Sequence, residues 1–385
     1  MQDEQSDVAD DPEISEVDFD GVELEVEEPE DFEHLIKEPF DPTKIRVRTW
    51  SPTIDLLMTR VREGEIDLMP EFQRSSGIWS KGAESRLIES ILIRIPLPAF
   101  YMDATDEEHL IVVDGLQRLT TLRRFVIDET LRLRGLEFLD DFTGKKFSDL
   151  PRQFQRRIQE TQVTVYLIEK GTPDEVKYNI FKRINTGGLP LSPQEIRHAL
   201  NPGPVVTFLK SLAESDEFQQ ATAGGVPGMR MDDRACVLRF AAFAITPYGD
   251  YNTRDFDHFL HSKMAELNAM SEDERESLGR RFRRSMAAAH RIFGDDAFRK
   301  LRSVANVRPP VNKALYEAWA VNLDARTDEE LNTLVEKKEE VRNAFINLLR
   351  TDQEFGTAIT SGTADPPKVK TRFRTIHELL TGILE

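Results

Sequence analysis

Cysteine, histidine and long apolar runs are scarce in this chain of 385 residues. The single cysteine, Cys236, excludes an internal disulfide framework and favours a reducing compartment. The N-terminal residues include no apolar segment of the signal-peptide type, and no apolar run approaches the length that crosses a bilayer. We therefore expect a soluble, cytoplasmic protein that has no membrane partner.

The signatures of several enzyme classes are missing as well. No Gly-x4-Gly-Lys-Ser/Thr pattern occurs, which excludes a P-loop NTPase. The seven histidines are scattered. His258 and His261 have ligand spacing on one helix face, but no cysteine or third histidine is nearby, so we interpret them as ordinary surface or core residues. The nuclease-like pattern at 173–177 falls on an expected helix and is interpreted as chance. No nuclease centre is predicted.

Basic residues are absent from the first 33 positions, which hold 16 Asp or Glu. The rest of the chain holds 51 basic and 53 acidic residues, so nearly all of the net charge of -18 lies in this arm. Residues 1–38 cannot bury enough apolar surface to order themselves, and we predict a disordered acidic tail. It is either a solvating tail or an arm that covers a basic groove as a nucleic-acid mimic.

The stretch from Leu110 to Leu122 has the most informative pattern. Four apolar residues predict a short buried strand, Asp114-Gly115 predicts a turn, and leucines at helical spacing predict a helix. The first turns of that helix hold four polar residues, Gln117, Arg118, Thr120 and Thr121. Free N–H groups and the helix dipole favour an anion there, Gly115 permits a close approach, and Arg118 adds a cation. The alternative is a buried strand–helix junction with an exposed arginine.

Strand and helix patterns divide the chain into two parts. Before Pro202 we expect strands at 99–102, 110–113 and 162–168, and a loop at 135–150. The expected helices lie at 52–63, with Ser51 as N-cap, and at 81–94, 151–159, 173–184 and 192–199. After Pro204 helical periodicity dominates, with helices near 204–214, 230–246, 253–269, 272–292, 311–323, 328–349 and 368–384. The predicted class is α+β, with a mixed domain at 45–200 and an all-α domain at 205–385.

Three motifs between residues 50 and 200 occur in an order that is typical of one family. They are Pro70-Glu-Phe-Gln-Arg74 with Trp79 and Ile95-Pro-Leu-Pro98, then Asp114-Gly-Leu-Gln-Arg-Leu-Thr-Thr-Leu122, then Phe181-Lys-Arg-Ile-Asn-Thr-Gly-Gly188 with Leu191-Ser192 and Glu195. In these motifs the chain resembles the N-terminal domain of GmrSD-type restriction endonucleases. That domain has a ParB/sulfiredoxin-like fold and an Asp-Gly-Gln-Gln-Arg box.

The resemblance implies a nucleotide-binding domain, with NTP hydrolysis as a further expectation, in a bacterial or phage-defence DNA-transaction system. The implied catalytic residues are Asp114, Gln117 and Arg118, with Mg²⁺ on Asp114. The residues expected to bind the nucleotide are Arg74, Gly115, Arg118, Thr120, Thr121, Arg183 and Asn185. Leu116 replaces the usual Gln of the box, which weakens the expectation of hydrolysis. The alternative is a non-catalytic DNA-binding or regulatory module that acts with a separate nuclease or defence-system protein.

Three of these residues also have a purely structural interpretation. Asp114 would cap its own turn, Arg74 would pair with Glu71 or Glu89, and Asn185 would end a helix. Two basic clusters are candidates for DNA contact, Arg280 with Arg281, Arg283 and Arg284, and Lys368 with Lys370, Arg372 and Arg374. The alternative for the first cluster is i,i+4 pairing with the acidic residues at 272–276.

Overall fold

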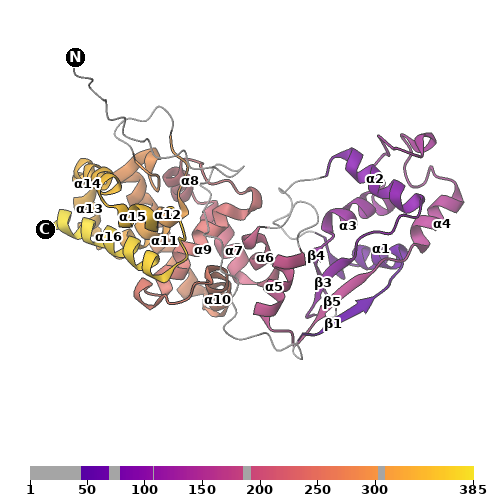
Figure 1. Cartoon of the computed structure of the whole chain (residues 1–385), viewed down its shortest axis with the longest axis horizontal. Helices are drawn as coiled ribbons and strands as arrows, with labels where there is room; N and C mark the ends of the chain where they lie inside the picture. Colours follow the sequence, from indigo (N-terminus) through magenta and orange to yellow (C-terminus); the bar gives the residue numbers. More distant parts are fainter. Residues whose placement is uncertain (1–44, 69–78, 107, 185–191, 302–307) are drawn as a thin grey trace, which may run out of the picture.

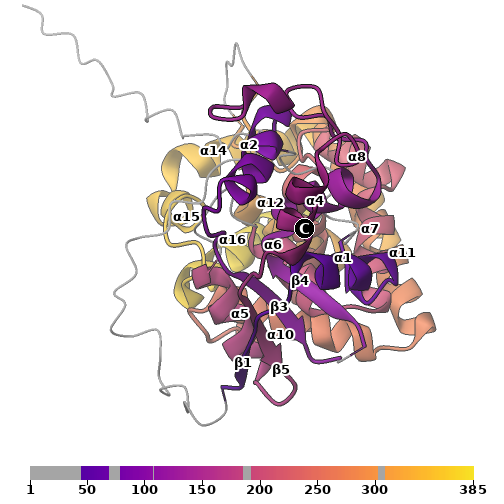
Figure 2. The same cartoon turned by 90° about the vertical axis from the view of Figure 1, so that its right-hand side faces the viewer.

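The protein is described by a computed structural model over residues 45–68, 79–106, 108–184, 192–301 and 308–385. The acidic tail expected at 1–38 lies outside these residues. Figure 1 shows a sheet with its helices at one end of the long axis and an assembly of helices at the other. Figure 2 looks along that axis from the sheet end, with the helical region behind the sheet. The class is therefore α+β, as predicted from the sequence.

The part before residue 202 contains every strand of the sheet. Its elements are β1 (Val47–Trp50), α1 (Ile54–Arg62), β2 (Ile66–Asp67), α2 (Lys81–Leu92), β3 (Phe100–Ala104), β4 (Leu110–Asp114), α3 (Leu116–Leu122), α4 (Arg152–Glu160), β5 (Val165–Glu169), α5 (Asp174–Ile184) and α6 (Pro193–Leu200). The strand order is β1-β5-β3-β4-β2. β5 is parallel to β3, and β4 is antiparallel to β3 and parallel to β2.

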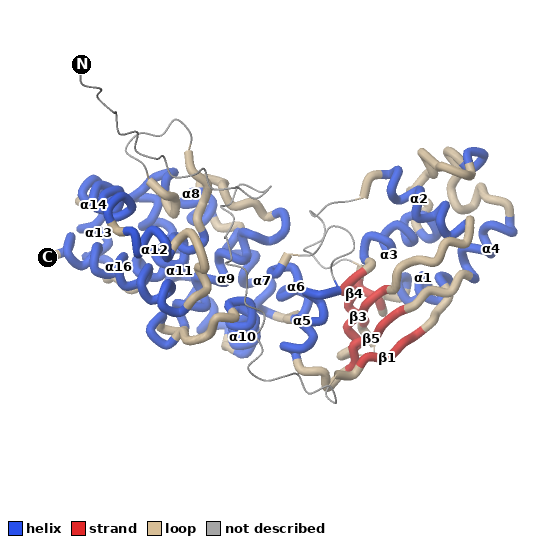
Figure 3. Tube along the Cα trace, viewed as in Figure 1, coloured by secondary structure: helices blue, strands red, loops and turns tan. Residues whose placement is uncertain are grey.

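Two apolar clusters cover the two faces of this sheet. The larger one joins the strands to α1, α2, α3 and α4 and includes Leu57, Ile91, Phe100 and Leu119. The smaller one joins β4 and β5 to α5 and α6. Figure 3 shows α5 and α6 between the sheet and the helical region, so they separate the two larger cores.

After residue 203 the described residues form helices and connecting loops, with isolated bridge residues such as Arg299 and Val311 and no β-strand. Its α-helices are α7 (Pro204–Ala213), α8 (Asp216–Thr222), α9 (Asp232–Ile245), α10 (Phe256–Ala269), α11 (Glu272–Phe293), α12 (Lys313–Asp324), α13 (Asp328–Glu336), α14 (Lys338–Thr351), α15 (Gln353–Ala358) and α16 (Pro366–Leu384). They enclose one large apolar cluster that extends from Val205 to Ile383.

A buried ion cluster lies inside this helical core. The carboxylate of Glu317 accepts from Arg372 and, at 3.2 Å, from Arg239. Arg372 is fully buried and also donates to the carbonyl of Thr363 (2.7 Å). Arg372 belongs to one of the two clusters expected to contact DNA, and its position in the core keeps it away from any phosphate.

Several expected elements differ from the observed ones. The segment 328–349 is two helices, because the backbone leaves helical geometry at Lys337, whose amine donates to the carbonyl of Ile383. The short helices α8 and α15 were not expected. β1 was missed because it is an edge strand with three exposed residues, so it lacks an alternating pattern. The helix expected from Pro52 begins instead at Ile54, and its N-cap is Thr53 rather than Ser51. The Thr53 hydroxyl accepts from Leu56 N at 3.2 Å.

One loop in the expected irregular segment at 135–150 is held by a buried carboxylate. Glu89 of α2 is 3% exposed and accepts from the backbone N–H groups of Glu137, Phe138 and Leu139 at 2.7–3.1 Å. Burial raises the pKa of this carboxyl, but the three N–H donors outweigh it and leave the pKa below 4.5. The loop is therefore fastened to α2 by an ionised side chain.

Candidate functional site at the Asp114 turn

The turn between β4 and α3 is built from Asp114 and Gly115. Gly115 has φ +96°, which an L side chain rarely adopts, and it precedes α3 without a side-chain cap. A Cβ atom at this position would lie 2.3 Å from Cδ1 of Phe100 and 3.1 Å from Nη2 of Arg118. Glycine is therefore required twice, by the backbone angle and by the packing around it.

Arg118 lies beneath this turn and is buried. One guanidinium nitrogen, Nη2, donates to Asp114 Oδ2 at 2.8 Å and to the carbonyl of Ala99 at 3.1 Å. The other, Nη1, donates to the carbonyl of Pro98, and the guanidinium carbon lies 4.5 Å from the centre of the Phe100 ring. The side chain thus fastens the segment before β3 to the end of β4. This position favours the junction interpretation of the motif, except that the arginine is buried rather than exposed.

The pKa values of Asp114 and Arg118 are shifted in opposite directions. Burial raises the pKa of Asp114, and the neighbouring Arg118 together with a hydrogen bond from the Gly115 backbone offsets part of the rise. Burial also lowers the pKa of Arg118, against the effect of Asp114. An arginine stays protonated through such a shift. The turn therefore carries a partly desolvated carboxylate with a fixed cationic partner.

The other residues expected in this motif have different environments. Gln117 and Thr120 are half-buried, so solvent reaches both. Thr121 is 1% exposed and its hydroxyl donates to the Gln117 carbonyl at 2.7 Å, which occupies it inside the helix. Leu116 is buried in the core beneath the sheet. Position 116 is thus part of the apolar core.

Three expected ligands belong to the first and third motifs. Arg74 and Asn185 lie outside the described residues, and the side chain of Arg183, near the end of α5, is also not among those described. The structure therefore brings together Asp114, Gly115 and Arg118, and leaves the contribution of Gln117 and of the other two motifs as an expectation.

Sequence reasoning missed two tyrosines beside the turn. Tyr101 pairs with Asp114 across β3 and β4 and stacks on Tyr166 of β5, with ring centres 5.0 Å apart. Burial raises the pKa of Tyr101, and the nearby Tyr166 and Asp114 raise it further. Tyr101 lies in a strand pattern that looks like ordinary core, so only the strand register identifies it as a neighbour of Asp114.

The nuclease-like pattern at 173–177, which was interpreted as chance, ends at a lysine that forms a second buried ion pair. Lys177 of α5 lies 3.2 Å from Asp103 Oδ2 at the end of β3 and also donates to the hydroxyl of Thr105. Lys177 is 4% exposed and Asp103 is 6% exposed. The Lys177–Asp103 pair therefore joins α5 to the sheet.

The basic clusters expected to contact DNA are largely paired. Arg281 binds Asp324 of α12 through both carboxylate oxygens, and Arg284 binds Asp328 at 2.9 Å and two backbone carbonyls. Only Arg280 makes the expected i,i+4 pair, with Glu276 at 3.8 Å. The dominant partners thus come from neighbouring helices and not from the acidic first turn of α11.

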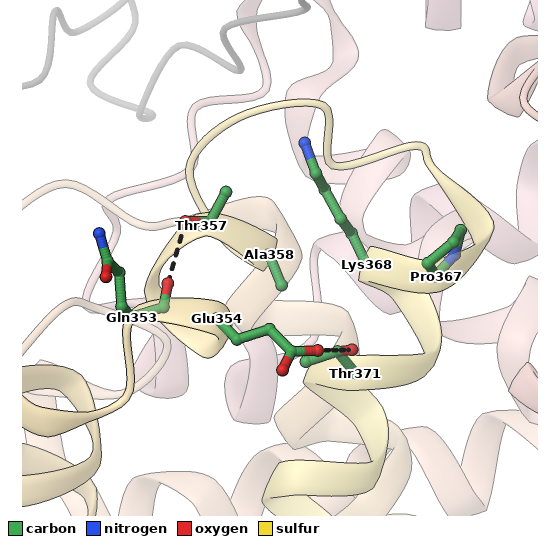
Figure 4. A pocket seen from close by; sticks show the side chains of 7 residues that line it. All are labelled: Gln353, Glu354, Thr357, Ala358, Pro367, Lys368 and Thr371. Atoms are coloured by element: carbon green, nitrogen blue, oxygen red, sulfur yellow. Dashed lines mark hydrogen bonds between the residues drawn. The ribbon is translucent and has the colours of Figure 1, made fainter.

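Metal and ligand sites elsewhere in the described residues are few. No group of three or more His, Cys, Asp or Glu in the part of the chain that is described is placed to hold a metal ion. Figure 4 shows a shallow hollow between α15 and α16, where Glu354 accepts from Thr371 at 3.0 Å and Lys368 donates to the Ser361 carbonyl. A ligand there would have to compete with these internal bonds.

Comparison with known protein families decides what kind of domain surrounds the Asp114 turn. The family described as GmrSD restriction endonuclease, N-terminal domain, matches residues 55–201. This segment is a GmrSD N-terminal domain. The comparisons with curated proteins and with solved structures found no match. No helix in the described part of the chain is long and apolar enough to cross a membrane.

Within the GmrSD N-terminal domain, the Asp-Gly-Leu-Gln-Arg box occupies the end of β4, which lies between β3 and β2 in the sheet, and the start of α3. The matched segment ends at Asn201, immediately after α6. It thus includes both faces of the sheet and stops where the helical region begins.

Proposed function

We propose that the chain is a nucleotide-binding protein of a bacterial or phage-defence restriction system. A ParB-like domain at 45–200 binds a nucleoside triphosphate with Mg²⁺, and a helical domain at 205–385 transmits or uses the bound state. The observation that carries this proposal is the Asp114 carboxylate, held by a buried arginine at a glycine turn inside a GmrSD N-terminal domain. A carboxylate fixed in this way is oriented before the ligand arrives.

Mg²⁺ suits this site as a metal that is shared with the ligand. The ion is usually bound by one or two carboxylates together with substrate phosphates and water. The Asp114 side chain is 24% exposed, and only its Oδ2 atom is paired with Arg118. It therefore has an accessible edge for a metal or a metal-bound water. The bound ion would supply charge stabilisation on the phosphates.

The remaining roles follow from position for the residues of the Asp114 turn, and from the resemblance in the other two motifs for the rest. Arg118 has its donors directed at Asp114 and at two carbonyls, so it is a positioning residue and not a phosphate ligand. The proposed phosphate contacts are Arg74, Arg183 and Asn185, with Gln117 and Thr120 at the solvent side of the turn. Gly115 and Thr121 keep the turn and the helix start in place.

The test is binding and turnover of ATP, GTP, CTP and UTP with Mg²⁺, with and without DNA, for the full chain and two variants. We expect Asp114→Asn to weaken Mg²⁺-dependent binding at least about tenfold, since one carboxylate ligand is removed. Asp128→Asn is the matched control, because Asp128 pairs with Arg123 at the far end of the same helical segment. Equal nucleotide affinity in both variants would refute the site.

A second candidate function is a regulatory module without hydrolysis that acts with a separate nuclease or defence-system protein, or binds DNA itself. It is favoured by Leu116, which is buried where the family usually has Gln, and by the internal bonds of Arg118. Nucleotide binding without phosphate release would support this candidate. Phosphate release that disappears in Asp114→Asn would support the enzyme.

A further inference from the structure

The helix α6 has an unusual composition for its position between two cores. Four of its eight residues are polar and at most 6% exposed, and the residue that ends it is 7% exposed, namely Gln194, Glu195, Arg197, His198 and Asn201. Buried polar groups cost free energy unless they are bonded. Their partners therefore show what this helix holds together.

One side of α6 faces the sheet. Ile196 packs with Val113 of β4, the residue before Asp114, in the small apolar cluster that also contains Tyr178 and Phe181. Tyr101, which pairs with Asp114 in the sheet, packs against the same cluster. The end of β4 and α6 thus share one small apolar cluster.

The first turn of α6 holds a strained segment of the helical region. The hydroxyl of Ser192 donates to the Arg230 carbonyl at 2.7 Å, and Glu195 Oε2 accepts from Arg230 Nε at 3.2 Å. Arg230 and Met231 have φ of +70° and +62°, a conformation that costs about 1 kcal/mol or more for each non-glycine residue. The contacts from α6 hold this turn in place directly before α9.

The last turn of α6 holds α10. Arg197 Nη1 donates to Asp257 Oδ1 at 2.9 Å, and the amide nitrogen of Asn201 lies 3.2 Å from Nδ1 of His261. Arg197 also donates to Gln194 at 3.0 Å, which fixes its orientation. α6 therefore touches two separate elements of the helical region through directional polar bonds, and the sheet through apolar contacts.

We propose that α6 couples the Asp114 turn to the helical region. A change at the end of β4 moves Val113 and Ile196, and this alters the bonds from α6 to Arg230 and Asp257. The strained Arg230–Met231 turn is the element with two arrangements, one held by Ser192 and Glu195 and one relaxed. Given the nucleotide site proposed above, a ligand at Asp114 and the packing of α9 and α10 then influence each other.

The first experiment needs no ligand. Hydrogen exchange of the full chain is compared for the wild type, Asp114→Asn, and Tyr101→Phe, which removes only a hydroxyl beside the turn and guards against a folding defect. We expect exchange in 229–245 and 256–269 to change at least about fivefold, the low end of coupling between sites. Changes confined to β4 and α3 in both variants would overturn the proposal.

A variant that removes the bond between Arg197 of α6 and Asp257 of α10 provides the control. In the Asp257→Ala background the response of α10 to Asp114→Asn should disappear, while the response inside α6 remains. Glu266→Ala is the matched control on the same helix, because Glu266 pairs with Lys263 at 2.6 Å and not with α6. A response of α10 that survives Asp257→Ala and Glu266→Ala alike would also overturn the proposal.

The second experiment uses Mg²⁺ with the nucleoside triphosphate that binds best. Because coupling of binding is reciprocal, Asp257→Ala should shift its Kd at least about fivefold and Glu266→Ala should leave it unchanged. Binding with equal Kd in both variants would refute the coupling but keep the nucleotide site. No binding of any nucleotide would refute the proposed function, and the exchange experiment would still decide on the coupling.

Discussion

Replacing Arg118 by alanine distinguishes a buried brace from a phosphate ligand. The substitution removes the donors to the carbonyls of Pro98 and Ala99, the bond to Asp114 Oδ2, and the contact with the Phe100 ring. Because Arg118 is buried, we expect the GmrSD N-terminal domain to become less stable even without nucleotide.

The magnitude follows from these contacts. Removing one partner of a buried pair costs about 3–5 kcal/mol, and the Asp114 side chain is partly exposed, so water recovers some of this. The loss of stacking on an aromatic ring adds about 0.5–2 kcal/mol. We expect a loss of about 3 kcal/mol, which corresponds to about 6–12 °C in Tm for a domain of this size.

The assay is urea unfolding of the full chain, followed by fluorescence and circular dichroism, beside nucleotide binding. Arg118→Lys keeps a cation but has no forked donor set, so we expect it to lose most of the same stability. Arg123→Ala is the control, since Arg123 is half-exposed and pairs with Asp128 at 3.3 Å on the surface. An Arg118→Ala protein that unfolds like the wild type, within about 0.5 kcal/mol, but binds no nucleotide would refute the brace.

Three further predictions concern other buried groups. Gly115→Ala should lower the free energy of unfolding by more than about 2 kcal/mol, of which roughly 1 kcal/mol comes from the positive φ and the rest from overpacking against Phe100. Gly144 also has a positive φ, +82°, but open space around it, so Gly144→Ala should lose only about 1 kcal/mol in the same urea titration. Glu89→Gln should destabilise by about 2–3 kcal/mol at pH 7. Because the folded pKa of Glu89 lies below its ordinary value of 4.5, the ionised carboxylate stabilises the fold at pH values above 4.5, and this stabilisation is lost as pH falls through the folded pKa. The difference in stability between Glu89→Gln and the wild type should therefore become smaller in thermal unfolding at acid pH. A stability difference between the two proteins that stays constant down to about pH 3 would contradict this role of the Glu89 carboxylate. Arg372→Ala should lose about 3–5 kcal/mol without a specific effect on DNA affinity, while the exposed Arg374→Ala stays within about 0.5 kcal/mol by thermal unfolding.

Local patterns determined much of what the structure contains. Leucines at helical spacing and the Asp114-Gly115 turn fixed the strand, turn and helix of the central motif, because these depend on neighbours within a few residues. The order of the three motifs was enough to identify the GmrSD N-terminal domain. Elements with exposed or short patterns, such as β1 and α15, left no comparable signal.

The bonding partners of the buried charged side chains could not be predicted from local sequence patterns. Nothing in the sequence around Arg118 separates a guanidinium that faces phosphate from one that bonds to Pro98 and Ala99, since the difference depends on a segment 19 and 20 residues away. The same holds for Arg372, whose neighbours in sequence are basic while its partner Glu317 is 55 residues distant. The sequence by itself determined which residues form the motif and its elements. Only the tertiary structure decided which of their charged groups pair within the fold and which remain accessible to a ligand. The reason is that burial and long-range pairing are set by packing and not by spacing along the chain.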